Sequence, residues 1–207
     1  IEEFHLDERV FRPGSQVPLY EQPGTFKGFR RGGGRGVGTR NYIIMLGTSS
    51  LTGSFAHQLE KRLKAESQRH GNIDGIVAVT HTEGASGVHP NNFDLLLRTL
   101  AGFMVNPNVA AVLALDYGHE AVTNRLLENY LREHGYPLQH VLHRFISLST
   151  EFNAELNEAE RIVRDWIPAV NSMTRSTQPL SELRIGLQCG GSDAFSGVSG
   201  NPLAGWV

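Results

Sequence analysis

Two clusters of histidine and glutamate directly follow apolar runs of this 207-residue chain. The run GIVAVT leads into His81-Thr82-Glu83-Gly84, and the run AAVLAL leads into Asp116-Tyr117-Gly118-His119-Glu120. An imidazole beside a carboxylate can work as a general acid/base pair, and both groups bind divalent cations. The clusters therefore predict a catalytic centre, with these candidate catalytic residues: His81, Glu83, His119 and Glu120.

Both clusters also have a structural interpretation. A histidine after a strand can cap a helix or bond a backbone carbonyl group. Glu120 can stand in the first turn of the next helix, where a negative charge is favoured. The polar neighbours of His81 favour a functional role for that residue, and both interpretations stay open at Glu120.

A third cluster, Cys189-Gly190-Gly191-Ser192-Asp193, follows the run LRIGLQ and contains the single cysteine of the sequence. A lone cysteine at a strand end can be a metal ligand or nucleophile, or a small buried apolar residue. The two glycines allow the backbone to approach a ligand closely. Ser192 or Asp193 can cap the next helix, whose free N–H groups would then face an anion.

A glycine- and arginine-rich segment, GFRRGGGRGVGTRN, covers residues 28–41. It precedes the first strand-like run, whereas a dinucleotide-binding fingerprint follows a strand and opens a helix, so the order of the elements argues against dinucleotide binding. The segment is expected to be either a solvated loop or a carboxylate-binding loop in which Arg35 and Arg40 present their guanidinium groups.

The elements that must position these residues are predicted from apolar periodicity. Five runs are expected to be strands: YIIMLG, GIVAVT, AAVLAL, VLHRFI and LRIGLQ. Apolar residues at helical spacing predict helices over residues 54–65, from Asn91 onward, over 121–134 and over 151–172, with Pro168 expected to kink or end the last one. This alternation predicts an α/β, Rossmann-like three-layer fold with a mainly parallel sheet of about five strands. Ligands bind at the carboxyl edge of such sheets, where all the polar clusters fall.

Composition narrows the classes of protein. Hydrophobic residues make up 40% of the chain, enough for one substantial core, and the net charge of −2 gives no reason to expect nucleic acid or a membrane as partner. No apolar stretch approaches the roughly 18 residues of a spanning helix. With one cysteine and no signal peptide at its start, the chain is expected to be cytoplasmic.

Both ends suggest a piece of a longer protein. Residues 1–27 contain three prolines and little periodicity, so a linker or extended arm is expected there. We expect one α/β domain over residues 28–190, and residues 191–207 as the start of a further segment.

Three blocks of the sequence, GFRRGGGRGVGTRN, GIVAVTHTEG and LRIGLQCGGSDAFSGVSGNPLAG, resemble the altronate/galactarate dehydratase family of hydro-lyases. The resemblance covers roughly residues 26–207. It implies removal of water from a sugar acid such as an aldonate or aldarate, assisted by a divalent metal, commonly Fe²⁺ or Mn²⁺. The sequence departs from the family pattern at Ala85 and His119, where members carry cysteines. If the cysteines of relatives bind metal, this chain uses His81, His119 and Cys189 as its ligands, binds metal differently or binds none, and the first of these is the expectation.

The substrate is then expected to be held by a set of polar residues: Arg35, Arg40, Asn41, Ser192 and Asp193. Two alternatives remain: a lyase that expels another group, such as sulfite, from a hydroxy acid, and a non-catalytic domain that binds sugar acids. A small-molecule sugar acid and the remainder of the full-length protein are the expected partners, and homo-oligomerisation is left open.

Overall fold

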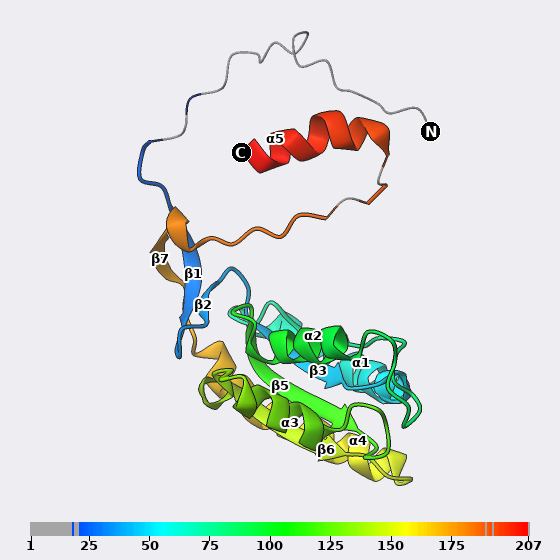
Figure 1. Ribbon diagram of the computed structural model, residues 1–207. Helices are drawn as coiled ribbons and strands as arrows, with labels where there is room; N and C mark the ends of the chain where they lie inside the picture. Colours follow the sequence, from blue (N-terminus) through cyan, green and yellow to red (C-terminus); the bar gives the residue numbers. More distant parts are fainter. Residues whose placement is uncertain (1–17, 19–20, 189, 192, 207) are drawn as a thin grey trace, which may run out of the picture.

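Four parallel strands form the central sheet. The computed structural model describes residues 18, 21–188, 190–191 and 193–206 (Figure 1). Across the sheet the strands follow the order β4 (Gly75–Val79), β3 (Tyr42–Gly47), β5 (Val109–Asp116) and β6 (Leu142–Ser147). All three neighbouring pairs are parallel. The predicted α/β, Rossmann-like fold is thus confirmed, with four strands in the parallel sheet.

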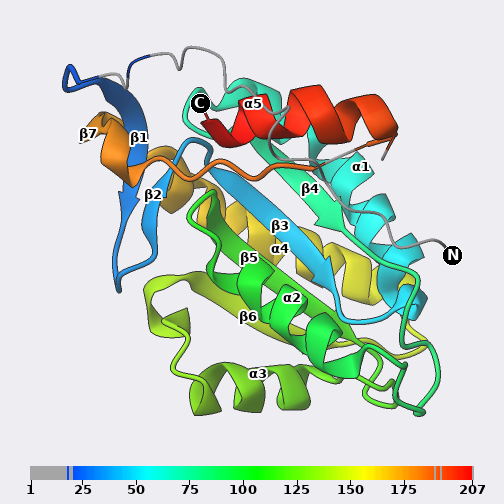
Figure 2. The same ribbon diagram turned by 45° about the horizontal axis from the view of Figure 1, so that its top comes forward.

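Two pairs of helices cover the two faces of this sheet (Figure 2). α1 (Gly53–Arg69) and α4 (Phe152–Asn171) pack on the face that presents Ile43 and Met45, and α2 (Phe93–Val105) and α3 (Asn124–Glu133) pack on the face that presents Ile44 and Leu46. Every residue of β5 is buried, because helices lie against both of its sides. These are the three layers that the sequence predicted.

All four predicted helices of the α/β domain are present, with small changes at their ends. Pro168 lies inside α4 but does not end it, since the helix continues to Asn171. Ile167 and Val170 are buried in the core beside it. Their packing holds the last turn although proline cannot donate a backbone hydrogen bond there. Among the described residues, no helix combines the length and the apolar character that crossing a membrane requires.

The glycine- and arginine-rich segment is not a loop. Its residues belong to a small antiparallel sheet in the order β2 (Gly36–Gly38), β1 (Thr25–Arg31) and β7 (Ser176–Pro179). Gly33 and Gly34 have φ values of 66° and 74°, the left-handed backbone that the turn between β1 and β2 requires. A Cβ atom on Gly38 would lie 2.1 Å from the carbonyl oxygen of Pro107, so only glycine lets β2 approach the parallel sheet this closely.

The prediction of a fifth strand is wrong. Residues 183–188, LRIGLQ, form no strand and lie exposed, with Ile185 at 74% and Leu187 at 68%. An apolar run becomes a strand only where a neighbouring strand offers its backbone, and the described residues offer none here. A π-helical turn (Ser196–Gly200) and α5 (Asn201–Trp206) follow, and Figure 1 draws α5 apart from the three layers. Three short 3-10 helices, Ser50–Thr52, Leu138–His140 and Leu180–Glu182, complete the elements of the residues that the structure describes.

Candidate active site

The two clusters of histidine and glutamate gather at one edge of the parallel sheet, as predicted, whereas the run before the third cluster forms no strand of this sheet. We call this edge the carboxyl edge: the segments 48–52, 80–88, 117–123 and 148–151, which follow β3, β4, β5 and β6 in turn. The chain runs from β3 outward to β4 and then returns to the other side of β3 to form β5. Between β3 and β5 the connections therefore leave toward opposite faces, which is where open α/β sheets form a ligand-binding crevice.

The carboxylate of Glu120 lies between the segments that follow β3 and β5 and is 5% exposed. Its Oε1 accepts hydrogen bonds from the Ser49 hydroxyl (3.2 Å) and from the Tyr117 amide (2.7 Å), and its Oε2 accepts one from the His119 amide (3.0 Å). Glu120 does not stand in the first turn of α3, which begins at Asn124. Its negative charge instead holds the loop after β5 and ties that loop to the end of β3.

The loop after β4 is joined to both neighbours through its backbone. The amide of Ser50 donates to the carbonyl of Glu83 (2.9 Å), and the amide of Ala121 donates to the carbonyl of Gly84 (3.3 Å). Three separate loops are thus held as one surface. The side chain of Glu83 is exposed on it.

A second buried carboxylate supports this surface from below. Asp116, 1% exposed, accepts hydrogen bonds from the backbone amide of Asn124 (2.6 Å) and from its side-chain Nδ2 (2.9 Å). The same Nδ2 also donates to the carbonyl of Ile146 in β6 (2.9 Å). The start of α3 is thereby fixed to the ends of β5 and β6. Sequence reasoning missed this pair, whose only signal was an aspartate at a strand end and an asparagine eight residues later.

His119 is exposed, and its ring orientation is set by its own loop. Its Nδ1 lies 3.3 Å from the carbonyl oxygen of Tyr117, so in the neutral ring Nδ1 carries the proton and donates it to that oxygen. The lone pair is then on Nε2. A neutral imidazole with an accessible lone pair can accept a proton or bind a cation.

His81 has the opposite arrangement. Its Nδ1 accepts a hydrogen bond from the amide of Glu83 (3.2 Å), so in the neutral ring the proton is on Nε2. Nε2 is buried and has no hydrogen-bond partner among the described residues. Burial lowers the pKa of His81 below its usual value of 6.5, and the backbone of Thr48 and the charge of Glu83 oppose this shift only in part. His81 is therefore neutral at pH 7.

Tyr117 is a further residue of the carboxyl edge that sequence reasoning did not select. Burial and the charges of Glu155 and Glu120 raise the pKa of its hydroxyl, which stays protonated and can donate. Glu155 in turn accepts hydrogen bonds from the amide (2.6 Å) and the hydroxyl (2.7 Å) of Ser149. The loop after β6 is thus fixed by a carboxylate in the same way as the loop after β5.

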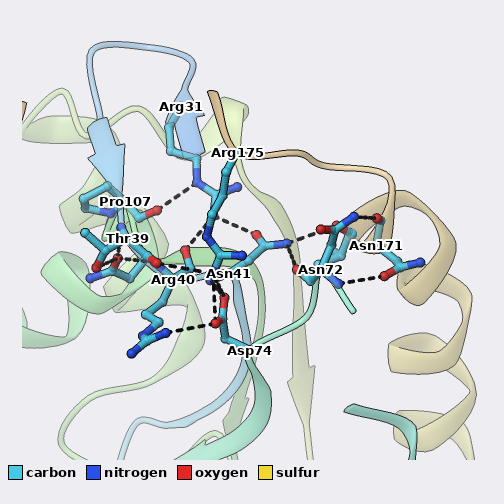
Figure 3. Close-up of polar contacts among 11 residues, drawn as sticks. Arg31, Thr39, Arg40, Asn41, Asn72, Asp74, Pro107, Asn171 and Arg175 are labelled. Carbon is cyan, nitrogen blue, oxygen red and sulfur yellow. Dashed lines mark hydrogen bonds and ion pairs between the residues drawn. The ribbon is translucent and has the colours of Figure 1, made fainter. Parts of the chain in front are cut away.

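The structure does not bring Arg35, Arg40 and Asn41 together with the histidines. These residues lie at the other end of the strands, which we call the amino edge, and the six residues of β3 place about 20 Å between the two edges. Asn41 donates to the carbonyls of Asn72 (2.7 Å) and Val170 (3.1 Å), and Arg40 pairs with Asp74 (3.3 Å; Figure 3).

Arg35, 8% exposed, donates four hydrogen bonds to backbone carbonyls, including those of Val105 (2.9 Å) and Asn106 (2.7 Å) at the end of α2. No small sugar acid could contact this guanidinium and His119 at once.

Of the third cluster, Cys189 and Ser192 lie outside the described residues. Asp193 accepts a hydrogen bond from the amide of Ser196 (2.8 Å), and this bond with the backbone lowers the pKa of its carboxyl. Asp193 thus has the helix-capping role that was one of its two interpretations.

The described residues do not by themselves form a metal site. They include no group of three histidine, cysteine, aspartate or glutamate side chains placed to share a cation. The oxygens of Glu120 and Asp116 already accept hydrogen bonds, and the free nitrogen of His81 is buried. Only His119 offers an exposed lone pair among the predicted ligands that the structure describes.

The fold and the site define a class: an α/β domain with acid–base groups held at the switch point of a parallel sheet. Residues 28–171 match the family model for D-galactarate dehydratase/Altronate hydrolase, second domain, and residues 180–207 match that for D-galactarate/Altronate dehydratase, C-terminal. The chain therefore belongs to the D-galactarate dehydratase/altronate hydrolase family, as its sequence blocks suggested.

Three relatives illustrate the range of the family. The chain is 31% identical to altronate dehydratase of Bacillus subtilis (strain 168) over 91% of this chain and 36% of the relative. It is 28% identical to altronate dehydratase of Escherichia coli (strain K12) over 97% and 39% of the two chains. It is 32% identical to (2R)-sulfolactate sulfo-lyase subunit beta of Chromohalobacter salexigens over 87% and 42%. The chain thus spans about two fifths of the length of these relatives.

Replacing Glu120 should disturb the carboxyl edge in a way that replacing Glu83 does not. In Glu120→Gln, the amide nitrogen must face one of the N–H or O–H donors that now bind the carboxylate. We expect a loss of about 1–3 kcal/mol in the free energy of unfolding, measured by urea denaturation at pH 7. Glu83→Gln makes the same chemical change on an exposed side chain and should stay within about 0.5 kcal/mol. Equal effects of the two changes would contradict the role given to Glu120.

His81 should make the protein less stable in acid. Because its pKa is lower in the folded chain than in the unfolded chain, the unfolded chain binds more protons as the pH falls below 6.5. The free energy of unfolding is therefore undiminished by this effect above pH 6.5 and decreases below it. Urea denaturation at pH 7.5 and 5.5, with EDTA present, should show a smaller decline in His81→Gln than in the unsubstituted chain. The control is His134→Gln, a change at an exposed histidine at the end of α3, which should show the same decline as the unsubstituted chain. An equal decline in the unsubstituted chain, His81→Gln and His134→Gln would refute the role given to His81.

Proposed function

We propose that this chain is the α/β part of a hydro-lyase that removes water from a hydroxylated carboxylic acid, a sugar acid such as an aldonate or aldarate. Family membership and the similarity to altronate dehydratases support this reaction class. The observation that carries the proposal is the exposed imidazole of His119 at the switch point of the sheet, whose Nδ1 lies 3.3 Å from the carbonyl oxygen of Tyr117 and leaves Nε2 for the substrate.

In the proposed reaction, His119 Nε2 takes the proton from the carbon next to the substrate carboxylate. The C–H electrons move into the carboxylate as an enolate-like intermediate, and their return expels hydroxide from the next carbon. Hydroxide leaves as water once it takes a proton from a nearby acid. The Tyr117 hydroxyl, kept protonated by its raised pKa, is the acid that the carboxyl edge offers. Glu120 acts on this reaction by holding the loops with its carboxylate rather than by touching the substrate, and Glu83 joins the loops only through its backbone.

The described residues do not supply every group that this reaction needs. The enolate-like intermediate needs nearby positive charge, and the described part of the carboxyl edge brings none to His119. We propose that the remainder of the full-length protein supplies that charge and the groups that hold the carboxylate. The name of the sulfo-lyase relative, a subunit beta, fits a family in which more than one chain or segment completes the protein.

One relative supports a second candidate reaction. The sulfolactate sulfo-lyase subunit is 32% identical to this chain, a level similar to that of the dehydratases. Sulfite could leave in place of hydroxide after the same proton abstraction, and His119 would keep its role. A screen for water and sulfite release from hydroxy acids separates the two reactions, and a domain that only binds sugar acids would release neither.

Replacing His119 should abolish most of the activity. We expect kcat of the full-length protein to fall by about 10²- to 10⁴-fold in His119→Ala, assayed on a panel of aldonic and aldaric acids. His134→Ala removes an imidazole at the opposite end of the domain and should leave kcat within twofold. Full activity of His119→Ala would remove this residue from the mechanism.

A divalent cation, Fe²⁺ or Mn²⁺, is an alternative proposal, because the Nε2 lone pair of His119 cannot bind a cation and take the substrate proton at once. His119 is the ligand that the described residues could contribute, and Cys189 and a group from the remainder of the protein would have to complete the site. Metal analysis of the full-length protein should find stoichiometric metal, with less in His119→Ala and an unchanged amount in His134→Ala. Metal retained in full by His119→Ala would exclude His119 as a ligand.

A further inference from the structure

The amino edge contains a cavity of about 510 Å³, within the size range of small-molecule sites. The turn between β1 and β2, the start of β6 and the connection from α4 to β7 enclose it. Three arginines line it, Arg30, Arg31 and Arg35, together with polar residues that include Gln139, His140 and Thr174. The described lining contains no carboxylate, so this cavity is strongly positive.

Two of these guanidinium groups are held in place without a counter-charge. Arg31 donates to the carbonyls of Pro107 (2.8 Å) and Arg40 (3.2 Å) and to Asn41 Oδ1 (2.7 Å; Figure 3). It also donates to Met173 Sδ (3.1 Å). The four acceptors of Arg35 are all backbone carbonyls. Among the described residues, the nearby carboxylates of Asp74 and Glu182 pair with other arginines: Arg40, Arg175 and Arg30.

The partial charges around the cavity do not balance these cations. The end of α2 supplies about half a negative charge to Arg35, against two full positive charges. Burial lowers the pKa of Arg31 and of Arg35 to about 10, and the charge of Arg35 contributes to the shift at Arg31. The two guanidinium groups therefore repel each other in a partly desolvated setting. An anion between them would relieve that repulsion.

Each guanidinium also keeps one hydrogen for a ligand. A guanidinium has five N–H groups. In each arginine, Nε donates one bond, Nη2 donates two and Nη1 donates one, which leaves one Nη1 hydrogen without an acceptor in the described structure.

We propose that this cavity binds a small oxyanion, phosphate or carboxylate, whose oxygens accept the remaining Nη1 hydrogens of Arg31 and Arg35. Guanidinium groups match the geometry of both anions. The site is separate from the carboxyl edge by about the length of β3, so it is not the place where the proposed substrate reacts.

Placing a carboxylate inside the cavity tests this site without removing either structural arginine. Thr174 is an exposed lining residue, and Thr174→Glu would supply a tethered carboxylate to the same hydrogens. Gln68→Glu adds the same charge on the surface of α1 and is the matched control. Calorimetric titration of the full chain with inorganic phosphate, and separately with galactarate, is done at constant ionic strength.

We expect saturable binding of at least one probe by the unsubstituted chain and by Gln68→Glu, and at least tenfold weaker binding by Thr174→Glu. Which probe binds distinguishes phosphate from carboxylate. Gln139→Glu offers a second position for the carboxylate should Thr174→Glu not fold. Absence of saturable binding of both probes, or binding to the cavity variants as tight as to Gln68→Glu, would overturn the proposal.

Discussion

The buried carboxylate of Glu120 is the interaction on which the carboxyl edge depends. A charge so little exposed is stable only when donors surround it, and here the donors come from the ends of two different strands. One of the three is the amide of His119, so the same bond that stabilises Glu120 fixes the backbone that carries the imidazole. Asp116, at the end of β5, is a second buried carboxylate that N–H donors stabilise, and its hydrogen bonds fix the start of α3.

The direction of the parallel strands explains why the two edges differ in chemistry. In this fold the helices begin at the carboxyl edge and end at the amino edge, so their partial charges are positive at the first and negative at the second. Carboxylates that accept backbone amides therefore suit the carboxyl edge, as Glu120 and Glu155 show. Arginines that donate to terminal carbonyls suit the amino edge, as Arg35 shows at the end of α2.

Three strands of the parallel sheet, β4, β3 and β5, could be predicted closely because buried parallel strands read as unbroken apolar runs. YIIMLG matches β3 residue for residue, and the other three runs differ from their strands by a residue or two. The same rule failed for residues 183–188, because an apolar run does not reveal whether a neighbouring strand exists. The hairpin of β1 and β2 was missed for a related reason. Its short strands depend on pairing with β7, about 150 residues away, and on Arg31 and Arg175 over the ring of Phe29.

The clustering of the candidate residues was predictable, but their individual roles were not. Position at a strand end placed His81 and His119 on the same edge. Which nitrogen of each ring is free depends on the amide of Glu83 and the carbonyl of Tyr117, contacts that arise only when the loops fold. The position of Arg35 is a similar case, since its acceptors lie about 70 to 105 residues away in the sequence.

The antiparallel pairing of β1 with β7 has a mechanical consequence. Thr25 lies opposite Pro179, so the chain enters and leaves the α/β unit through two adjacent strands. A unit joined to its surroundings by such a two-stranded stem can be inserted into a larger protein without separating the segments on either side.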